Sequence, residues 1–178
     1  MKIIAIIGLT ILVYWLYNKF FKKKPDKIFF DGLNALKSGH DSYANDFIAS
    51  KEKELIDYNP TIYAIFQTTM LYRTSISEGT KMEECLEFCN NWLNKLKSQN
   101  LDTLINYYYL MYLKARILTS LNENKESLEE ALMIYKKVIE MDEKFGRAYL
   151  HMGINYEYLG IKDLAYKNIV VVACIYSA

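Results

Sequence analysis

The sequence contains few of the residues that build tight turns. Its 178 residues include only two prolines and seven glycines, too few for the frequent turns of a β-rich fold. Residues 169–172 read Ile-Val-Val-Val and are strongly β-branched, but they lie within a stretch of helical periodicity. The scarcity of turn residues therefore predicts an all-α protein.

Cysteine and histidine are also scarce, which limits metal and disulfide chemistry. The three cysteines are Cys85, Cys89 and Cys174, and the two histidines are His40 and His151. An odd number of cysteines does not fit a disulfide framework. Cys85 and Cys89 are one helical turn apart but have no second ligand pair at zinc spacing, so we expect them to be buried apolar side chains. We expect no metal, no cofactor and a reducing compartment.

Catalytic motifs are missing as well. The chain has no G-x-G-x-x-G, P-loop, H-E-x-x-H or G-x-S-x-G sequence. Neither histidine has a nucleophile or carboxylate at a motif spacing. The acidic pairs Glu83–Glu84 and Glu129–Glu130 fall in the first turns of predicted helices, where they complement the helix dipole. We therefore expect no catalytic residue and a protein that is not an enzyme.

Basic residues are concentrated at the N-terminus. Residues 1–27 hold six lysines and one aspartate, a net charge of +5, whereas the remainder holds 16 basic and 20 acidic side chains, a net charge of −4. Phosphate binding requires a clustered basic face. An acidic body lacks such a face, so we expect no nucleic-acid partner.

Residues 3–21 form a long hydrophobic segment. No residue from Ile3 to Tyr17 is charged, and an apolar helix of about 20 residues spans the hydrocarbon core of a bilayer. We predict a transmembrane anchor over residues 1–21. The alternatives are a signal peptide, which would need small residues at a cleavage site, and a buried first helix, which would need a polar face.

Lysines fix the expected orientation of this anchor. Five lysines follow the apolar run, at positions 19, 22, 23, 24 and 27, whereas Lys2 precedes it. By the positive-inside rule the body then faces the cytoplasm in a single-pass membrane protein. Residues 22–27 would form a basic linker and residues 28–178 the helical domain. A mitochondrial membrane fits if the source is eukaryotic.

From Ile28 onward, apolar residues recur every three or four positions, as in amphipathic helices. The sequence predicts helices near 28–38, 41–57, 60–76, 80–98, 101–121, 126–142, 145–159 and 161–176. Asn59-Pro60 marks one helix start, because proline fits the first helical position. Thr80–Glu83 and Ser127–Glu130 read as capping boxes. Short connections between these helices predict antiparallel pairs.

Two segments carry a repeating pattern. In residues 146–177 the first predicted helix presents Tyr149, Met152, Gly153 and Tyr156, and the second presents Ala165, Ile169 and Val172, with Leu159–Gly160 between them. This arrangement resembles a tetratricopeptide repeat (TPR). Residues 108–142 resemble a degenerate copy with extra turn residues at 122–125, and residues 28–98 share only the helix-pair spacing. The resemblance implies a TPR-like solenoid of stacked antiparallel helix pairs in which Gly153 and Ala165 let two helices approach closely.

A TPR-like stack implies a concave groove, lined by first helices, that holds an extended peptide or a helix of a partner protein. The candidate groove residues are Tyr109, Tyr112, Arg116, Thr119, Arg147, Leu150, Ile154 and Glu157. Single tyrosines and leucines on such helices also serve packing alone. Arg116 is compatible with the carboxylate clamp of chaperone-binding members, but Leu150 and Ile154 do not supply its other residues, so we expect no such clamp.

The last predicted helix ends in an apolar run, Val170–Tyr176, with no polar capping helix after it. Solenoids usually end in a polar cap. Either the sequence is truncated, or we expect this face to be covered by a partner, a second copy or a membrane.

We expect a membrane-anchored adaptor or receptor that binds a protein through its groove. The alternative is a constitutive accessory subunit of a larger membrane complex. An N-terminal anchor before TPR-like helices is also similar in layout to mitochondrial outer-membrane import receptors.

Overall fold

The computed structural model describes residues 25–102, 106–121 and 124–177. These residues form nine α-helices and no strand. Their bounds are α2 (Pro25–Lys37), α3 (Asp41–Ser50), α4 (Glu52–Tyr58), α5 (Pro60–Glu78), α6 (Met82–Ser98), α7 (Tyr107–Leu121), α8 (Lys125–Met141), α9 (Gly146–Tyr158) and α10 (Lys162–Ser177). The all-α prediction is confirmed for this part of the chain.

The expected anchor over residues 3–21 lies outside the described residues. Within them, every helix is too short or too polar to cross a bilayer. The helix α2 begins at Pro25, inside the segment expected to be a linker. Proline is favoured at the first position of a helix because its missing N–H would be unpaired there in any case.

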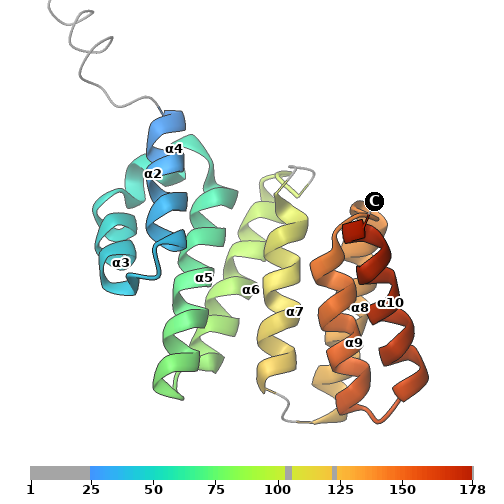
Figure 1. The fold of residues 1–178 in the computed structure, drawn as a ribbon. Helices are drawn as coiled ribbons and strands as arrows, with labels where there is room; N and C mark the ends of the chain where they lie inside the picture. Colours follow the sequence, from blue (N-terminus) through green and yellow to red (C-terminus); the bar gives the residue numbers. More distant parts are fainter. Residues whose placement is uncertain (1–24, 103–105, 122–123, 178) are drawn as a thin grey trace, which may run out of the picture.

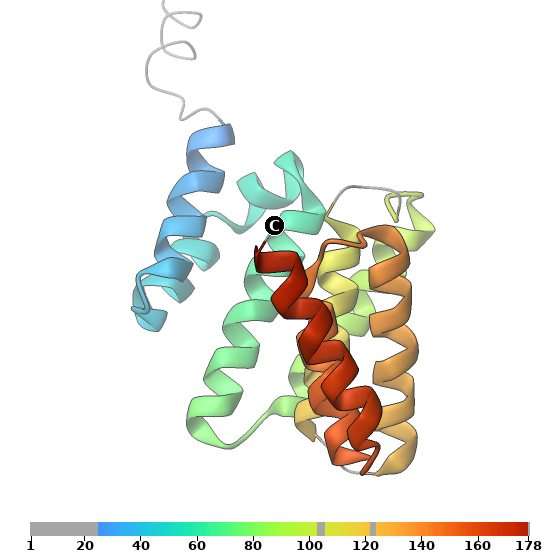
Figure 2. The same cartoon turned by 45° about the vertical axis from the view of Figure 1, so that its right-hand side comes forward.

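From α5 onward the helices stack in chain order as antiparallel pairs (Figure 1; turned by 45° in Figure 2). α5 packs against α6, α7 against α8, and α9 against α10, while α2 is followed by the short helices α3 and α4. The first helices of successive pairs also contact one another, α2 with α5, α5 with α7, and α7 with α9. One row of first helices therefore runs from one end of the stack to the other, and it forms the frame of the site described below.

Local sequence explains where several helices begin. Asn59 caps α5, because its side-chain oxygen accepts hydrogen bonds from the backbone N–H groups of Thr61 and Ile62, each at 3.1 Å. Pro60 occupies the first turn, as predicted. At the far end, Gly79 adopts the left-handed conformation with a φ of 65°, which glycine adopts without a steric penalty.

Both expected capping boxes need correction. α6 begins at Met82 with Lys81 as its capping residue, and no side chain caps it, so Thr80 lies before the first turn. α8 begins at Lys125 because Asn124 acts as the cap, accepting a 2.8 Å hydrogen bond from the Ser127 N–H. Asparagine is among the best capping residues. The helix therefore starts after Asn124, three residues before the predicted cap Ser127.

The helix expected over residues 41–57 is two helices. It breaks at Lys51, whose φ of −118° and ψ of 10° lie outside helical values. The buried residues Ala44 and Ile48 on α3 and Leu55 on α4 still point into one core. The apolar spacing was therefore a correct guide to burial but gave no sign of the break.

The last pair, α9 and α10, has most of the burial pattern that the TPR resemblance predicts. On α9, Met152, Gly153 and Tyr156 are buried, and on α10 Ala165 is buried. A β-carbon placed on Gly153 would lie 3.2 Å from the Ala165 carbonyl oxygen, which confirms the expected close approach. Ile169 departs from the pattern, since it is 51% exposed on the open side of α10.

The cysteines behave as predicted for apolar side chains. Cys85 and Cys89 are fully buried on α6, and their thiols lie against the Thr68 and Leu110 carbonyl oxygens, each at 3.7 Å. Burial raises the pKa of both thiols to about 12. Both therefore stay protonated at neutral pH, whereas Cys174 is exposed.

Candidate functional site

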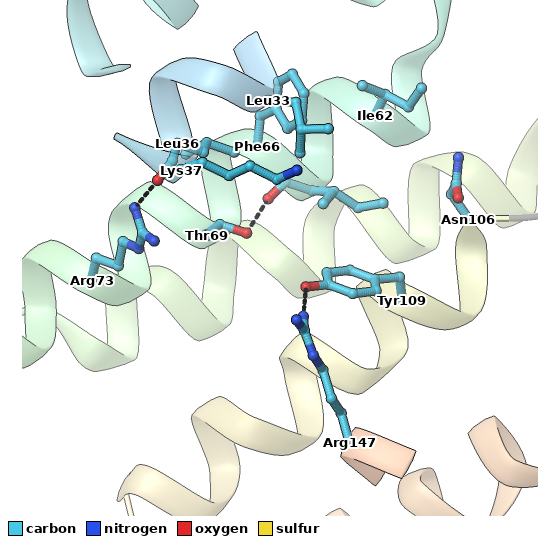
Figure 3. Close-up of a pocket in the computed structure, with 11 residues that line it drawn as sticks. Leu33, Leu36, Lys37, Ile62, Phe66, Thr69, Arg73, Asn106, Tyr109 and Arg147 are labelled. Atoms are coloured by element: carbon cyan, nitrogen blue, oxygen red, sulfur yellow. Dashed lines mark hydrogen bonds between the residues drawn. The ribbon is translucent and has the colours of Figure 1, made fainter. Parts of the chain in front are cut away.

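A pocket of about 450 Å³ opens along the row of first helices (Figure 3). It is lined from α2, α5, the start of α7 and the start of α9 by Leu33, Leu36, Lys37, Ile62, Ile65, Phe66, Thr69, Arg73, Asn106, Tyr109 and Arg147. No second helix of a pair contributes to this lining. We call this surface, together with the adjoining faces of α7 and α9, the groove.

The groove has an apolar side and a cationic side. Leu33 from α2 and Ile62 and Phe66 from α5 lie together on one side, while Arg147 approaches from the other (Figure 3). Phe66 lies so close to α2 that a β-carbon on Gly32 would be 2.5 Å from its ring. Glycine at position 32 thus allows α2 and α5 to pack closely under the apolar side.

Three cations and no carboxylate belong to the described lining. Arg73 is held from two directions: its Nη1 donates to the Leu36 carbonyl at 2.6 Å and lies 3.4 Å from an Asp41 carboxylate oxygen. Both side chains of that ion pair are more than a third exposed, so solvent screens it. The pair joins α2 and α5 to the start of α3 and shapes one end of the groove.

Arg147 lies at the other end of the pocket. Its Nη1 donates a 3.2 Å hydrogen bond to the Tyr109 hydroxyl, which couples α9 to α7 (Figure 3). The Tyr109 ring packs edge-on against Phe145, with ring centroids 5.8 Å apart. The exposed guanidinium of Arg147 is therefore presented on a fixed aromatic support.

Arg116 lies two turns beyond Tyr109 on the same side of α7, outside the pocket lining. Its Nη2 donates to the Tyr72 hydroxyl at 3.2 Å, and its guanidinium lies 4.7 Å from the centre of the Tyr72 ring and 5.9 Å from that of Tyr112. The Tyr72 hydroxyl also bonds to Ser120 at 2.8 Å. These contacts hold the side chain in place, but the Nε of Arg116 is buried and has no hydrogen-bond acceptor among the described residues.

His151 packs beside these arginines. Its ring lies 5.7 Å from the Tyr112 ring. Burial, and after it the positive charges of Arg116 and Arg147, together lower the pKa of His151 to about 4. The imidazole is therefore neutral at physiological pH, and the positive charge of the groove resides on its arginines and lysine.

The structure separates the eight predicted groove residues into two groups. Tyr109 and Arg147 line the pocket. Arg116 lies further along α7, outside that lining, and Leu150 and Glu157 are exposed on α9 with Ile154 half-buried beside them. The remaining two lie in the core, since Tyr112 is 2% and Thr119 is 6% exposed. Thr119 contacts the Tyr135 hydroxyl at 3.1 Å, and Tyr112 packs against Phe145 at 5.0 Å. Both contacts belong to the packing of α7 against its neighbours.

The sequence interpretation missed the apolar side of the groove. Ile62, Ile65, Phe66, Thr69 and Arg73 recur every three or four residues on α5, so a signal was present. It was masked because α5 is buried on almost every side in its first half, which hides the difference between a core face and a groove face.

The described residues contain no cluster of three or more His, Cys, Asp or Glu side chains that could hold a metal. The groove combines an apolar wall, ring faces and guanidinium groups. Surfaces that bind peptide segments commonly combine these elements.

The helix pairs, their common row of first helices and the groove along that row define a TPR-like helical-repeat fold. Among solved structures, the chain is similar to the crystal structure of MamA, with a TM-score of 0.57 and 16% sequence identity over 92% of this chain and 85% of that chain. Neither the family models nor the curated protein sequences give a match. The likeness to MamA supports the TPR-like fold, and at this identity it supports the fold alone.

Proposed function

We propose that this protein is an adaptor that binds a segment of another protein in its groove. The observation that carries the proposal is the pocket lining, which comes from α2 and from the first-helix side of the three pairs that follow it, and from none of the second helices. In a TPR-like stack that row faces inward, so its side chains converge on one bound segment.

A non-catalytic role is part of this proposal. The chemistry of the groove supports a non-catalytic role. The His151 ring is tilted against the Tyr112 ring, and its pKa is lowered by burial and by nearby arginines. The two buried thiols, Cys85 and Cys89, lie on a second helix and have pKa values raised by burial to about 12. Neither kind of group is placed to act as a nucleophile or general base in the groove.

We also propose that the adaptor is tethered to a membrane through residues 3–21, with its helical body on the cytoplasmic side. The support is the sequence alone: an uncharged apolar run followed by a lysine cluster. Membrane fractions of the source cells provide the test. The full chain should resist carbonate extraction, whereas a chain starting at Pro25 should be released; release of both would refute the anchor.

Site-specific photo-crosslinking tests the groove. A benzophenone amino acid at Thr69, which lines the pocket, should give a discrete crosslinked partner when the full chain is irradiated in its own cells. The matched control carries the same group at Lys136, an exposed position on α8. Equal crosslinking from both positions, or none from Thr69, would argue against a groove-binding adaptor.

A second candidate function is a constitutive accessory subunit of a membrane complex. One observation favours it: α10 exposes Tyr166, Ile169, Val170 and Tyr176 at 71%, 51%, 41% and 68%. We propose that this face self-associates or packs on another subunit. Light scattering of the detergent-solubilised full chain decides between the candidates, since a dimer lost in the Ile169→Lys variant favours the accessory role and a concentration-independent monomer favours the free adaptor.

A further inference from the structure

The two arginines of α7 and α9 carry positive charge that the described chain does not neutralise. The ion pairs of the described residues join Lys51 to Glu54, Arg73 to Asp41, Lys114 to Glu130 and Lys125 to Glu129. None of them includes Arg116 or Arg147, although carboxylates outnumber basic residues in the body of the protein. Arg116 and Arg147 therefore have no ion-pair partner among the described residues, although the body of the protein is acidic overall.

The helix α7 contains its own comparison. Lys114 and Arg116 are two residues apart and so project from roughly opposite sides of the helix. Lys114, on the side of α8, meets the Glu130 carboxylate at 2.8 Å. Arg116, on the groove side, meets the Tyr72 hydroxyl and ring faces instead. Lys114, on the α8 side of the helix, therefore has a carboxylate partner, whereas Arg116, on the groove side, has none among the described residues.

An incomplete hydrogen-bond set points the same way. The buried Nε of Arg116 has no acceptor among the described residues, and a buried donor without a partner costs about 1–3 kcal/mol. A guanidinium presents donors in a planar fork that fits both oxygens of a carboxylate. Because the Nε is buried, another molecule would meet Arg116 at the outer nitrogens of its guanidinium, of which Nη2 already donates to the Tyr72 hydroxyl. A negatively charged oxygen acceptor suits these outer nitrogens.

We propose that the groove binds an acidic segment of a partner protein, whose carboxylates pair with Arg116 and Arg147 while its apolar side chains enter the pocket between α2 and α5. This inference rests on the proposed groove function and specifies the chemistry of the partner. Leu33, Ile62 and Phe66 form the apolar wall of the pocket, whose volume of about 450 Å³ is enough for a few side chains. Carboxylates beside apolar anchors are thus the complementary pattern.

Other occupants fit less well. The basic residues at positions 19–27 of this chain would meet the groove arginines with like charge. An anionic membrane surface is flat, whereas Arg147 lines a concave pocket. A nucleic acid would bring many phosphates against a body whose net charge is −4. An acidic protein segment avoids all three conflicts.

Three matched peptides test the inference on the detergent-solubilised full chain. Each is a fluorescent synthetic peptide with leucines at helical spacing, and its remaining positions are all Glu, all Gln or all Lys. Fluorescence anisotropy should show the Glu peptide binding at least about tenfold more tightly than the Gln peptide, because hydrogen bonds to charged groups are stronger than those between neutral groups. The Lys peptide should not bind, and added salt should weaken only the Glu peptide.

Variants locate the effect. Arg116→Gln and Arg147→Gln should each weaken the Glu peptide about tenfold and leave the Gln peptide unchanged. Lys136→Gln, on an exposed face of α8, should change neither. Because Arg147 is exposed, its variant keeps the test valid even if Arg116→Gln fails to fold by circular dichroism.

The outcomes separate the two levels of the proposal. Equal binding of the Glu and Gln peptides, unaffected by the arginine variants, overturns the acidic partner but leaves a groove adaptor. No binding of any peptide, together with no crosslink from Thr69, overturns the adaptor itself. Arginine-dependent binding of phosphatidylserine vesicles in place of the Glu peptide would assign the cations to a membrane and refute the protein partner.

Discussion

Removing the imidazole of His151 should make the stability of this protein less sensitive to acid. The His151 side chain packs on Tyr112 from α7 and faces the guanidinium groups of Arg116 on α7 and Arg147 on its own helix. Burial, followed by these two positive charges, lowers its pKa in the folded state to about 4. In the unfolded chain the ordinary value of about 6.5 applies.

The sign and size follow from proton linkage. Between these two pKa values the unfolded state binds more protons, so the free energy of unfolding rises with pH. Stability is fully present above about pH 6.5 and is lost as the pH falls toward 4. A full shift corresponds to about 2 kcal/mol between neutral pH and pH 5, and partial solvent access reduces our expectation to about 1–2 kcal/mol.

Urea unfolding, followed by circular dichroism, measures the free energy of unfolding near pH 7.5 and near pH 5. The change between the two pH values is then compared between the wild type and His151→Gln. The wild type should lose about 1–2 kcal/mol more than His151→Gln on acidification, because carboxylate titrations are common to both chains. The control is His40→Gln, since His40 is the other histidine and is exposed; it should behave like the wild type. If the wild type and His151→Gln lose the same stability, His151 is not a buried neutral group.

Other predictions test burial and capping. Cys174 should react with a thiol reagent in the native protein while Cys85 and Cys89, which are fully buried, react only after unfolding; three reactive thiols in the native state would contradict the packing of α6. Asn59→Ala should cost about 1 kcal/mol in urea unfolding through loss of the α5 cap, and no loss would mean that α5 begins elsewhere. Asn155→Ala should cost about 2 kcal/mol, because its amide donates to a buried carbonyl of α8 at 2.9 Å; a neutral result would show that water replaces it.

Helical periodicity predicted the fold class because it reports burial directly. The apolar residues of α8, Ala131, Tyr135 and Val138, are fully buried as their spacing indicates. The boundaries were less accurate where two signals competed. At α8, Asn124 and Ser127 are both good caps, and only the packed helix decides which residue caps it.

The groove was predictable in part. Arg147 and Tyr109 follow from their places on first helices, and the structure joins them by a hydrogen bond. Tyr112 and Thr119 share that helix but turn into the core, a difference of one helical face that the sequence does not resolve. Phe66 is the opposite case, a residue with the burial of a core side chain (3% exposed) that nevertheless lines the pocket. Its role depends on the nearby glycine of α2, which no local pattern reveals.

Arg116 is best explained by binding rather than by stability. A half-buried guanidinium loses part of its hydration. Contacts with ring faces and one hydroxyl compensate this loss of free energy less well than a carboxylate would. Apolar residues often replace buried charges with no loss of stability, so the fold itself does not require arginine at this position. The chain places a carboxylate opposite Lys114 on the far side of the same helix, so acidic residues are available where packing needs them. An arginine without an ion-pair partner on the row of first helices is therefore consistent with a negative charge that arrives from another molecule.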